Sequence, residues 1–203
     1  MKNKHQDLII VFTRNPELGK VKTRLAKGIG DVAALDVYKK LLTHTEETIL
    51  PINADKAIYY SVKVRDNDIW NNEAYLKYQQ TGEDLGIRML NAFKSAFKSG
   101  YKKVIIVGSD LYDLRATHLE KAFSALDQND YVIGPAKDGG YYLLGMTQLT
   151  GSVFKDKDWG TSTVCQNTLN DLEGNKVHIL ETLNDIDFAE DLKPYEDFKY
   201  VFK

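Results

Sequence analysis

The chain has 203 residues, of which 43% are hydrophobic and 28% are charged, and its formal net charge is -2. These values are ordinary for a folded globular protein, and they exclude an overall electrostatic attraction to nucleic acid or to an anionic membrane. The single cysteine, Cys165, excludes an internal disulfide and a thiolate-rich metal site. We expect one domain over residues 1–203, no nucleic-acid partner and a cytoplasmic location.

Short apolar runs alternate with amphipathic segments along the chain. The run at residues 8–13 is too short to span a membrane, so no integral membrane contact is expected. Strands are predicted at residues 8–13, 56–62, 75–80, 103–107, 130–133, 141–146 and 177–180. Helices are predicted after the first loop, at residues 31–50, 83–99, 117–129 and 162–172, and from 187 onward. Thr161 or Ser162 is expected to cap the helix at 162–172.

This alternation predicts an α/β fold with a mostly parallel sheet and right-handed crossovers. The turn between Gly134 and Gly140 joins two strands like a hairpin, which favours one antiparallel strand. We therefore expect a three-layer α/β/α arrangement around a mixed sheet. Ligands of such sheets bind outside the carboxyl ends of the strands, where three loops of this chain carry polar residues.

The first of these loops is cationic. Arg14, Lys20, Lys22 and Arg24 follow the first strand, and Gly19 allows a tight turn among them. Lysine and arginine before a helix N-terminus suit a di- or triphosphate. A solvated cationic turn explains the same residues, so charge alone leaves both interpretations open.

The second and third loops are acidic. Asp110 follows the most strand-like run, residues 103–107, where a carboxylate can hold Mg²⁺ or Mn²⁺ against phosphate oxygens, and Asp113 is expected to cap the next helix. Asp138 stands beside Gly139 and Gly140, where it can bind sugar hydroxyls, orient an acceptor or act as a base. A helix cap at the second loop and a tight Asp-Gly turn at the third are the structural alternatives.

Six segments, in order, resemble a bacterial family of unassigned function that is grouped with glycosyltransferases. They are FTRNPELGKVKTRLA, QTGEDLGIRM, GSDLYDL, GPAKDGGYYLLG, WGTSTV and LNDIDFAEDL. That family belongs to the nucleotide-diphospho-sugar transferase superfamily, with a GT-A-like fold, and is similar to guanylyltransferases of cofactor biosynthesis. The resemblance covers nearly the whole chain, but fold does not fix the reaction.

The resemblance implies a role for each matching residue. Lys22 and Arg24, with Arg14 nearby, match contacts to nucleotide phosphates. Gln80, Gly82 and Asp84 match a nucleotide-binding block in which Gln80 reads the base. Asp110 matches the metal ligand, and Asp187 is a candidate second carboxylate, with a helix cap as the alternative. Asp138, Gly139 and Gly140 match the block near the sugar or acceptor, and Trp159 shapes the acceptor pocket.

Two departures from the family pattern stand out. Tyr112 replaces the usual Pro in GSDLYDL, which is expected to alter the loop beside the metal. Phe188 replaces the usual Thr after Asp187.

The leading expectation is a metal-dependent glycosyltransferase that takes a nucleotide-diphospho-sugar and a small-molecule acceptor. The alternatives are a nucleotidyltransferase that joins a nucleotide to a phosphorylated small molecule, and a non-catalytic nucleotide-binding module.

Overall fold

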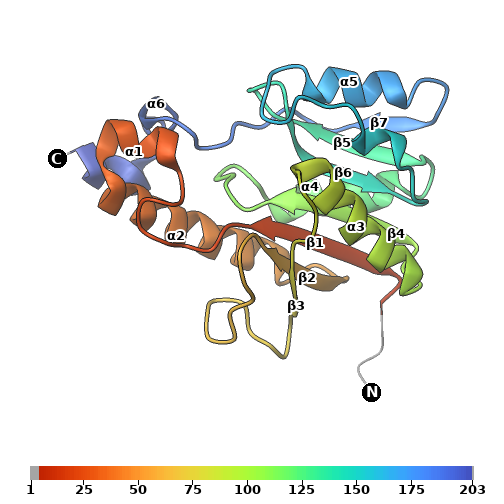
Figure 1. Cartoon of the computed structure of the whole chain (residues 1–203), viewed down its shortest axis with the longest axis horizontal. Coiled ribbons are helices and arrows are strands. Elements are labelled where there is room, and N and C mark those ends of the chain that lie inside the picture. Colours follow the sequence, from red (N-terminus) through yellow and green to blue (C-terminus); the bar gives the residue numbers. More distant parts are fainter. Residues whose placement is uncertain (1–4, 203) are drawn as a thin grey trace.

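The structure, a computed structural model, describes residues 5–202. Within these residues seven strands form one sheet with the order β3-β2-β1-β4-β6-β5-β7 (Figure 1). The strands are β1 (Asp7–Thr13), β2 (Asp55–Tyr60), β3 (Leu76–Gln79), β4 (Lys103–Gly108), β5 (Tyr131–Pro135), β6 (Tyr141–Met146) and β7 (Val177–Ile179). The seven predicted strands are all present. The predicted antiparallel strand is β6, which is antiparallel to β4 and β5, while the other pairs are parallel.

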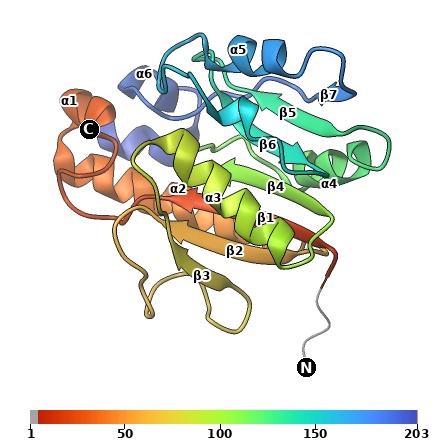
Figure 2. The ribbon, with the colours of Figure 1, turned by 45° about the vertical axis from the view of Figure 1, so that its right-hand side comes forward.

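Helices connect the strands and cover both faces of the sheet (Figures 1 and 2). They are α1 (Thr23–Ile29), α2 (Asp31–Ile49), α3 (Leu85–Lys98), α4 (Ala116–Ala125), α5 (Val164–Asp171) and α6 (Ala189–Leu192), with 3₁₀ helices η1 (Ser152–Phe154) and η2 (Glu196–Phe202). The predicted helices are present with shifted ends. The cap predicted for α5 is wrong, because Thr163 is the N-cap residue without a side-chain cap bond and the Thr161 hydroxyl donates to the Asp158 carbonyl at 2.8 Å.

Two apolar clusters hold the three layers together. Alternate residues of β1 face opposite sides, so that Ile9 and Val11 pack with α2 and α4, while Leu8 and Ile10 pack with α3 and α5. A third cluster joins α1, α2, α6 and η2, and in it Leu25, Ile186 and Phe198 are fully buried. This cluster brings the C-terminal segment back over the first loop, beside the carboxyl ends of β1 and β4.

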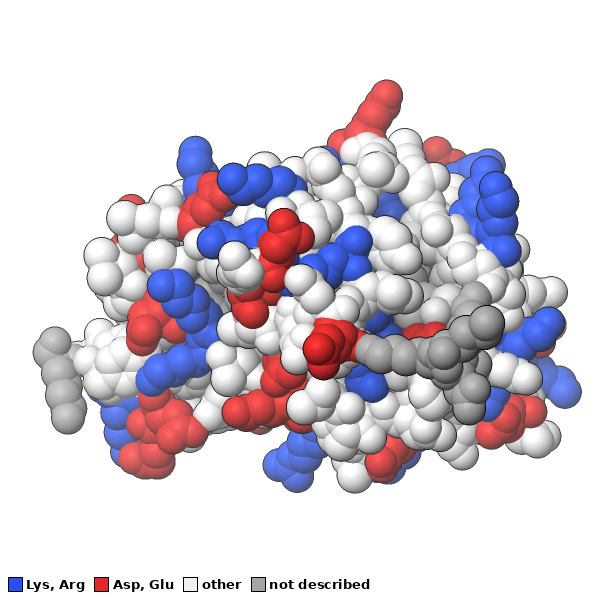
Figure 3. All heavy atoms as spheres, turned by 90° about the horizontal axis from the view of Figure 1, so that it is seen from below, with Lys and Arg blue, Asp and Glu red and all other residues white. Residues whose placement is uncertain are grey.

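Charge is distributed without a single dominant sign on the face seen in Figure 3, where Lys and Arg alternate with Asp and Glu. Among the described residues, no helix has both the length and the apolar character needed to span a bilayer.

Candidate active site

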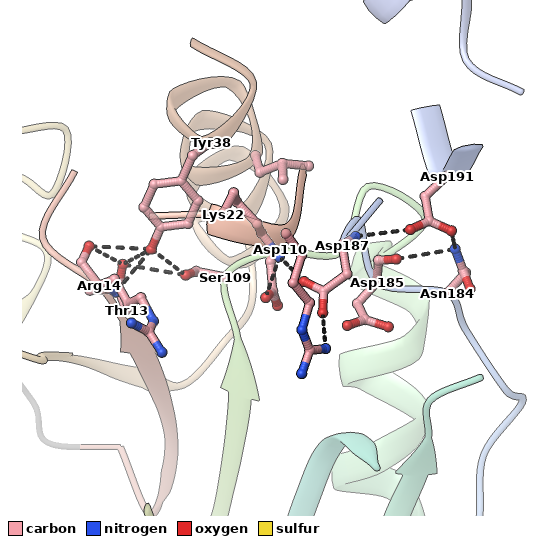
Figure 4. A network of polar contacts seen from close by, with 12 residues as sticks. Thr13, Arg14, Lys22, Tyr38, Ser109, Asp110, Asn184, Asp185, Asp187 and Asp191 are labelled. Atoms are coloured by element: carbon pink, nitrogen blue, oxygen red, sulfur yellow. Dashed lines mark hydrogen bonds and ion pairs between the residues drawn. The ribbon is translucent and has the colours of Figure 1, made fainter. Parts of the chain in front are cut away.

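The carboxyl ends of β1 and β4 are tied together by the hydroxyl of Tyr38, which comes from α2. This hydroxyl lies 3.1 Å from Thr13 Oγ1 and 3.3 Å from Ser109 Oγ, and it accepts a bond of 2.9 Å from the Arg14 amide (Figure 4). Burial raises the pKa of Tyr38, so it stays a neutral donor and acceptor. The Tyr38 hydroxyl therefore fixes the starting positions of the two loops that carry Arg14 and Asp110.

Three carboxylates meet at this edge. Asp110 follows β4, whereas Asp185 and Asp187 lie on the segment of residues 183–188 that crosses from β7 to α6. One oxygen from each of the three lies within 4.8 Å of the others. The segment is anchored at its start, because the Leu183 amide donates to the Pro135 carbonyl at 3.1 Å.

Two cations from the first loop contact the same carboxylates. Lys22 Nζ donates to Asp110 Oδ2 at 2.8 Å and to Asp187 Oδ1 at 2.9 Å, and Arg24 donates to Asp187 Oδ2 at 3.0 Å (Figure 4). Burial alone would lower the pKa of the Lys22 ammonium, but the two carboxylates outweigh burial and raise it. Burial alone would raise the pKa of Asp187, but Lys22 and Arg24 outweigh it and lower it.

Asp185 was not among the predicted site residues. Burial, followed by repulsion from Asp110, Asp138 and Asp187, raises its pKa to about 6. A usable signal was present in the sequence, because residues i and i+2 of an extended segment point to the same side. Asp185 and Asp187 have this spacing.

The cluster fits a divalent cation of the Mg²⁺ or Mn²⁺ type. These ions take carboxylate oxygens at about 2.0–2.2 Å, so ligand oxygens on one ion lie roughly 3–4.5 Å apart. One oxygen from each of Asp110, Asp185 and Asp187 lies within 4.8 Å of the others, close to this spacing. Burial and then repulsion from the neighbouring carboxylates raise the pKa of Asp185, and a bound cation would offset that repulsion.

A pocket of about 270 Å³ adjoins the carboxylates. Asp110, Asp138 and Asp185 line its polar side, and Trp159 and Phe12 are among its aromatic walls. Its other walls are largely apolar and come from β1, β4, β6, α3 and α5. The full lining is Phe12, Leu85, Met89, Ile106, Val107, Gly108, Asp110, Leu111, Ala136, Asp138, Gly140, Tyr141, Tyr142, Trp159, Gly160, Thr161, Val164 and Asp185.

The third loop forms one side of this pocket. Asp138 Oδ1 accepts the Gly140 amide at 2.8 Å, so the turn holds the exposed carboxylate at the pocket rim. Gly139 has a φ of 90°, and its carbonyl accepts the Cys165 amide of α5 at 2.9 Å. The structure thus brings Asp138, Gly140 and Trp159 to the same pocket as Asp110.

The predicted nucleotide-binding block lies between β3 and α3. The Gln80 amide donates to the Tyr59 carbonyl at 2.9 Å and to the Thr13 carbonyl at 3.3 Å, which fixes it beside the first loop. Asp84 is the N-cap of α3 and accepts the Ile87 amide at 2.8 Å. Gly82, with a φ of 141°, accepts a bond of 2.9 Å from Arg88 Nε. These bonds give Asp84 and Gly82 structural roles, while the Gln80 carbonyl oxygen remains available to a ligand.

The first loop presents its other two cations, Arg14 and Lys20, outward. The Arg14 side chain is exposed, and Gly19 has a φ of 70° in the turn in which the Lys20 amide donates to the Glu17 carbonyl at 3.0 Å. Buried Asn15 fixes the loop, because its side chain accepts the Val62 amide at 2.9 Å. Arg14 therefore presents an exposed side chain from a fixed backbone.

Two expectations about the neighbouring residues are corrected, and the packing of a third residue is defined. Asp113 does not cap α4, because its carboxylate accepts the Tyr195 hydroxyl at 2.7 Å. Asp187 is not a helix cap, because Asp191 accepts the amides at the start of α6. Tyr112 turns away from the carboxylates, bonds Asp197 and packs against Phe198 with ring centroids 4.7 Å apart.

Two further features were not predicted. Tyr38 orders both strand ends although it lies in α2, far from any recognisable motif. Leu85, at the start of α3, is 43% exposed and lines the open pocket.

Fold and site together define a protein of the nucleotide-diphospho-sugar transferase fold. The chain belongs to DUF2064, a family described as uncharacterized proteins conserved in bacteria, whose model matches residues 45–161. The expected family relationship and fold class are therefore confirmed. A search of curated protein sequences found no match.

Solved structures place the chain in the same fold. A protein from Desulfovibrio desulfuricans G20, described as a "putative nucleotide-diphospho-sugar transferase", is 30% identical with a TM-score of 0.84, over 97% of this chain and 94% of that chain. The 4-diphosphocytidyl-2C-methyl-D-erythritol synthase from Anaerococcus prevotii is 13% identical with a TM-score of 0.62, over 97% and 96% of the two chains. The inositol-1-phosphate CTP transferase from T. maritima is 16% identical with a TM-score of 0.57, over 100% and 97%.

Proposed function

We propose that this chain is a metal-dependent transferase that takes its donor as a nucleotide-diphospho-sugar and transfers the sugar to a small-molecule acceptor. The observation that carries this proposal is the position of the three carboxylates. They separate a cationic loop, whose Arg14, Lys20 and Arg24 are exposed, from a pocket whose lining contains no lysine, arginine or histidine. Phosphates suit the first region and an uncharged ring suits the second.

Asp110, Asp185 and Asp187 are the residues that would hold Mg²⁺ or Mn²⁺. When bound, such an ion stabilises negative charge on a leaving diphosphate. Arg14 is exposed beside this cluster and can reach phosphate oxygens, which is the role expected of it. Gln80 offers its carbonyl oxygen to a donor group on a nucleobase, since its amide protons bond the protein.

The pocket lining fits a sugar ring. Trp159 offers an aromatic face for the apolar side of a pyranose, and Asp138 offers an exposed carboxylate oxygen for its hydroxyls. Asp138 can also accept a proton from an acceptor hydroxyl at this rim. Gly139 and Gly140 support the proposal by holding the Asp138 turn against α5.

Nucleotidyl transfer is the alternative that the carboxylates and cations also fit. It requires an acceptor phosphate near the metal, and one of the similar structures carries the name of an inositol-1-phosphate CTP transferase. The anionic lining of the pocket disfavours such an acceptor, because its phosphate would face Asp138 and Asp185. Non-catalytic nucleotide binding is the third candidate function, and it assigns no ligand to the pocket.

The test is to incubate the protein with Mn²⁺ and a panel of nucleotide-sugars or nucleoside triphosphates, and to identify the leaving group. Release of nucleoside diphosphate from one nucleotide-sugar, absent in Asp110→Asn, supports glycosyl transfer. Release of pyrophosphate from a triphosphate supports nucleotidyl transfer instead. Binding measured by thermal shift without any turnover would support the binding module.

A further inference from the structure

Lys22 has an unusual backbone for its residue type. Its φ of 46° and ψ of 45° place it in the left-handed region immediately before α1. Among the described non-glycine residues only Lys22 and Asp156 have a positive φ. This conformation is unfavourable for a residue with a Cβ atom, so surrounding contacts must hold it.

The side chain of Lys22 is buried against the carboxylates. It is 6% exposed, compared with 54% for Arg24 and 36% for Asp110. Its two partners lie 88 and 165 positions away in the sequence, so this one ammonium joins three separate segments. A lysine placed to meet an incoming phosphate would need a more accessible Nζ than this one has.

Lys22 forms ion pairs with two of the three carboxylates that would hold a divalent cation. The ammonium uses one oxygen of Asp110 and one of Asp187, and Arg24 uses the other oxygen of Asp187. Only Asp185, the third member of the cluster, has no ion pair with a described lysine or arginine. A divalent cation bound to these carboxylates would lie beside the Lys22 ammonium. Repulsion between the two positive charges raises the free energy of the metal-bound protein.

We propose that Lys22 is an internal counter-ion that competes with the divalent cation for Asp110 and Asp187. This inference rests on the proposed function and assigns Lys22 a role other than the phosphate contact expected from the family resemblance. Lys22 offsets part of the negative charge of the cluster in the metal-free protein and gives up at least one of its two bonds when the ion binds. It is a positioning residue that sets the affinity of the site for metal.

The competition is tested by titrating the metal-free protein with Mn²⁺, without nucleotide, and following free Mn²⁺ by electron paramagnetic resonance. Lys22→Met should bind Mn²⁺ at least about fivefold more tightly than the unaltered protein. Lys27→Met is the matched control, because Lys27 is an exposed lysine of α1 and makes no ion pair among the described residues. It should stay within about twofold of the unaltered protein.

Lys22→Gly repeats the test with a residue that adopts the left-handed conformation freely, in case the methionine variant does not fold. In the unaltered protein, ¹⁵N-lysine spectra should show the Lys22 ammonium resonance shifting as Mg²⁺ binds. Equal or weaker Mn²⁺ binding by both variants, or an unchanged ammonium resonance, would overturn the inference alone. No Mn²⁺ binding by any variant would overturn the metal dependence in the proposed function as well.

Discussion

The backbone amide of Ile186 donates a hydrogen bond of 3.1 Å to the backbone carbonyl of Asp110. Ile186 is fully buried among residues of α1, α2 and η2, so Asp185 and Asp187 on either side of it project the other way. This single bond therefore fixes the spacing between the loop after β4 and both carboxylates of residues 183–188. The site depends on the C-terminal segment as much as on the strand that carries Asp110.

Replacing Asp110 with Asn should remove metal binding while leaving the fold intact. The substitution takes one charge and one anionic ligand from the cluster, and Lys22 keeps its bond to Asp187. We expect Mn²⁺ affinity to fall at least about tenfold and any metal-dependent turnover about a hundredfold. Calorimetry and turnover assays check this, with Asp113→Asn as the control because that carboxylate bonds Tyr195 instead. Equal losses in both variants would contradict the assignment.

Replacing Asp185 with Asn should stabilise the metal-free protein in a pH-dependent way. The pKa of Asp185 is about 6 in the folded state and 3.8 ordinarily, so between these values the folded state binds more protons than the unfolded state. Stability therefore falls as pH rises through this window, and the full penalty remains above it. Asn removes the penalty, which is on the order of 2 kcal/mol above pH 7 and absent below pH 4.

Urea unfolding at pH 5 and pH 8, without divalent ions, measures this effect. The gain from Asp185→Asn should be larger at pH 8 than at pH 5. The exposed Asp158 supplies a control, since Asp158→Asn should change stability by less than about 0.5 kcal/mol at both values. A gain that is equal at the two pH values would show that ionisation of the buried Asp185 carboxyl is not its cause.

Apolar periodicity predicted the strands and helices because each depends on a few neighbouring residues. The strand ends also predicted which loops meet, which is why Asp110 and Asp138 were identified together, whereas Asp187 was identified through the family resemblance. The paired state of Lys22 was not predictable, because it depends on partners 88 and 165 residues away. The packing of Tyr112 was not predictable for the same reason, since its ring contacts Tyr195 and Phe198, more than 80 residues away. The single-domain expectation stays a prediction.

Gly139→Ala should lower the free energy of unfolding by more than the backbone strain of a positive φ explains. Its φ is 90°, and an added Cβ would lie 2.2 Å from the Ser162 carbonyl oxygen. Gly174 has a φ of 83° with nothing within 4 Å, so Gly174→Ala measures the conformational cost by itself. In chemical unfolding, we expect the free energy of unfolding to fall by about 1 kcal/mol for Gly174→Ala and by at least about 3 kcal/mol for Gly139→Ala. Equal losses of unfolding free energy in the two variants would show that the third loop can move away from α5 without an energetic penalty.

Tyr112→Ala should loosen the C-terminal segment without changing the carboxylates directly. The ring packs on Tyr195 and Phe198, with centroids 5.0 Å and 4.7 Å away, and its hydroxyl bonds Asp197. We expect a loss of about 2–3 kcal/mol and faster proteolysis within η2. Tyr112→Phe removes only the hydroxyl and should cost about 1 kcal/mol. Equal proteolysis of the two variants would contradict an aromatic anchor.

Substitution of Trp159 tests whether the pocket binds the sugar of the donor. Its indole lies against the Gly86 backbone of α3, where an added Cβ would be 2.7 Å from Trp159 Cζ2, and it meets Tyr141 edge-on at 6.5 Å. Trp159→Ala removes an aromatic wall of the pocket but touches neither the carboxylates nor the cationic loop. We expect nucleotide-sugar affinity to fall about tenfold, while nucleoside diphosphate affinity stays unchanged.

Trp159→Phe keeps an aromatic face and should retain most of the sugar affinity. Calorimetry with the nucleotide-sugar and the matching nucleoside diphosphate, both with Mn²⁺, separates the two contributions. A parallel loss for both ligands would mean that Trp159 contacts the nucleotide, which would move the base into this pocket and the sugar out of it. A loss confined to the nucleotide-sugar places the transferred group between Trp159 and Asp138, beside the carboxylates that would hold the metal.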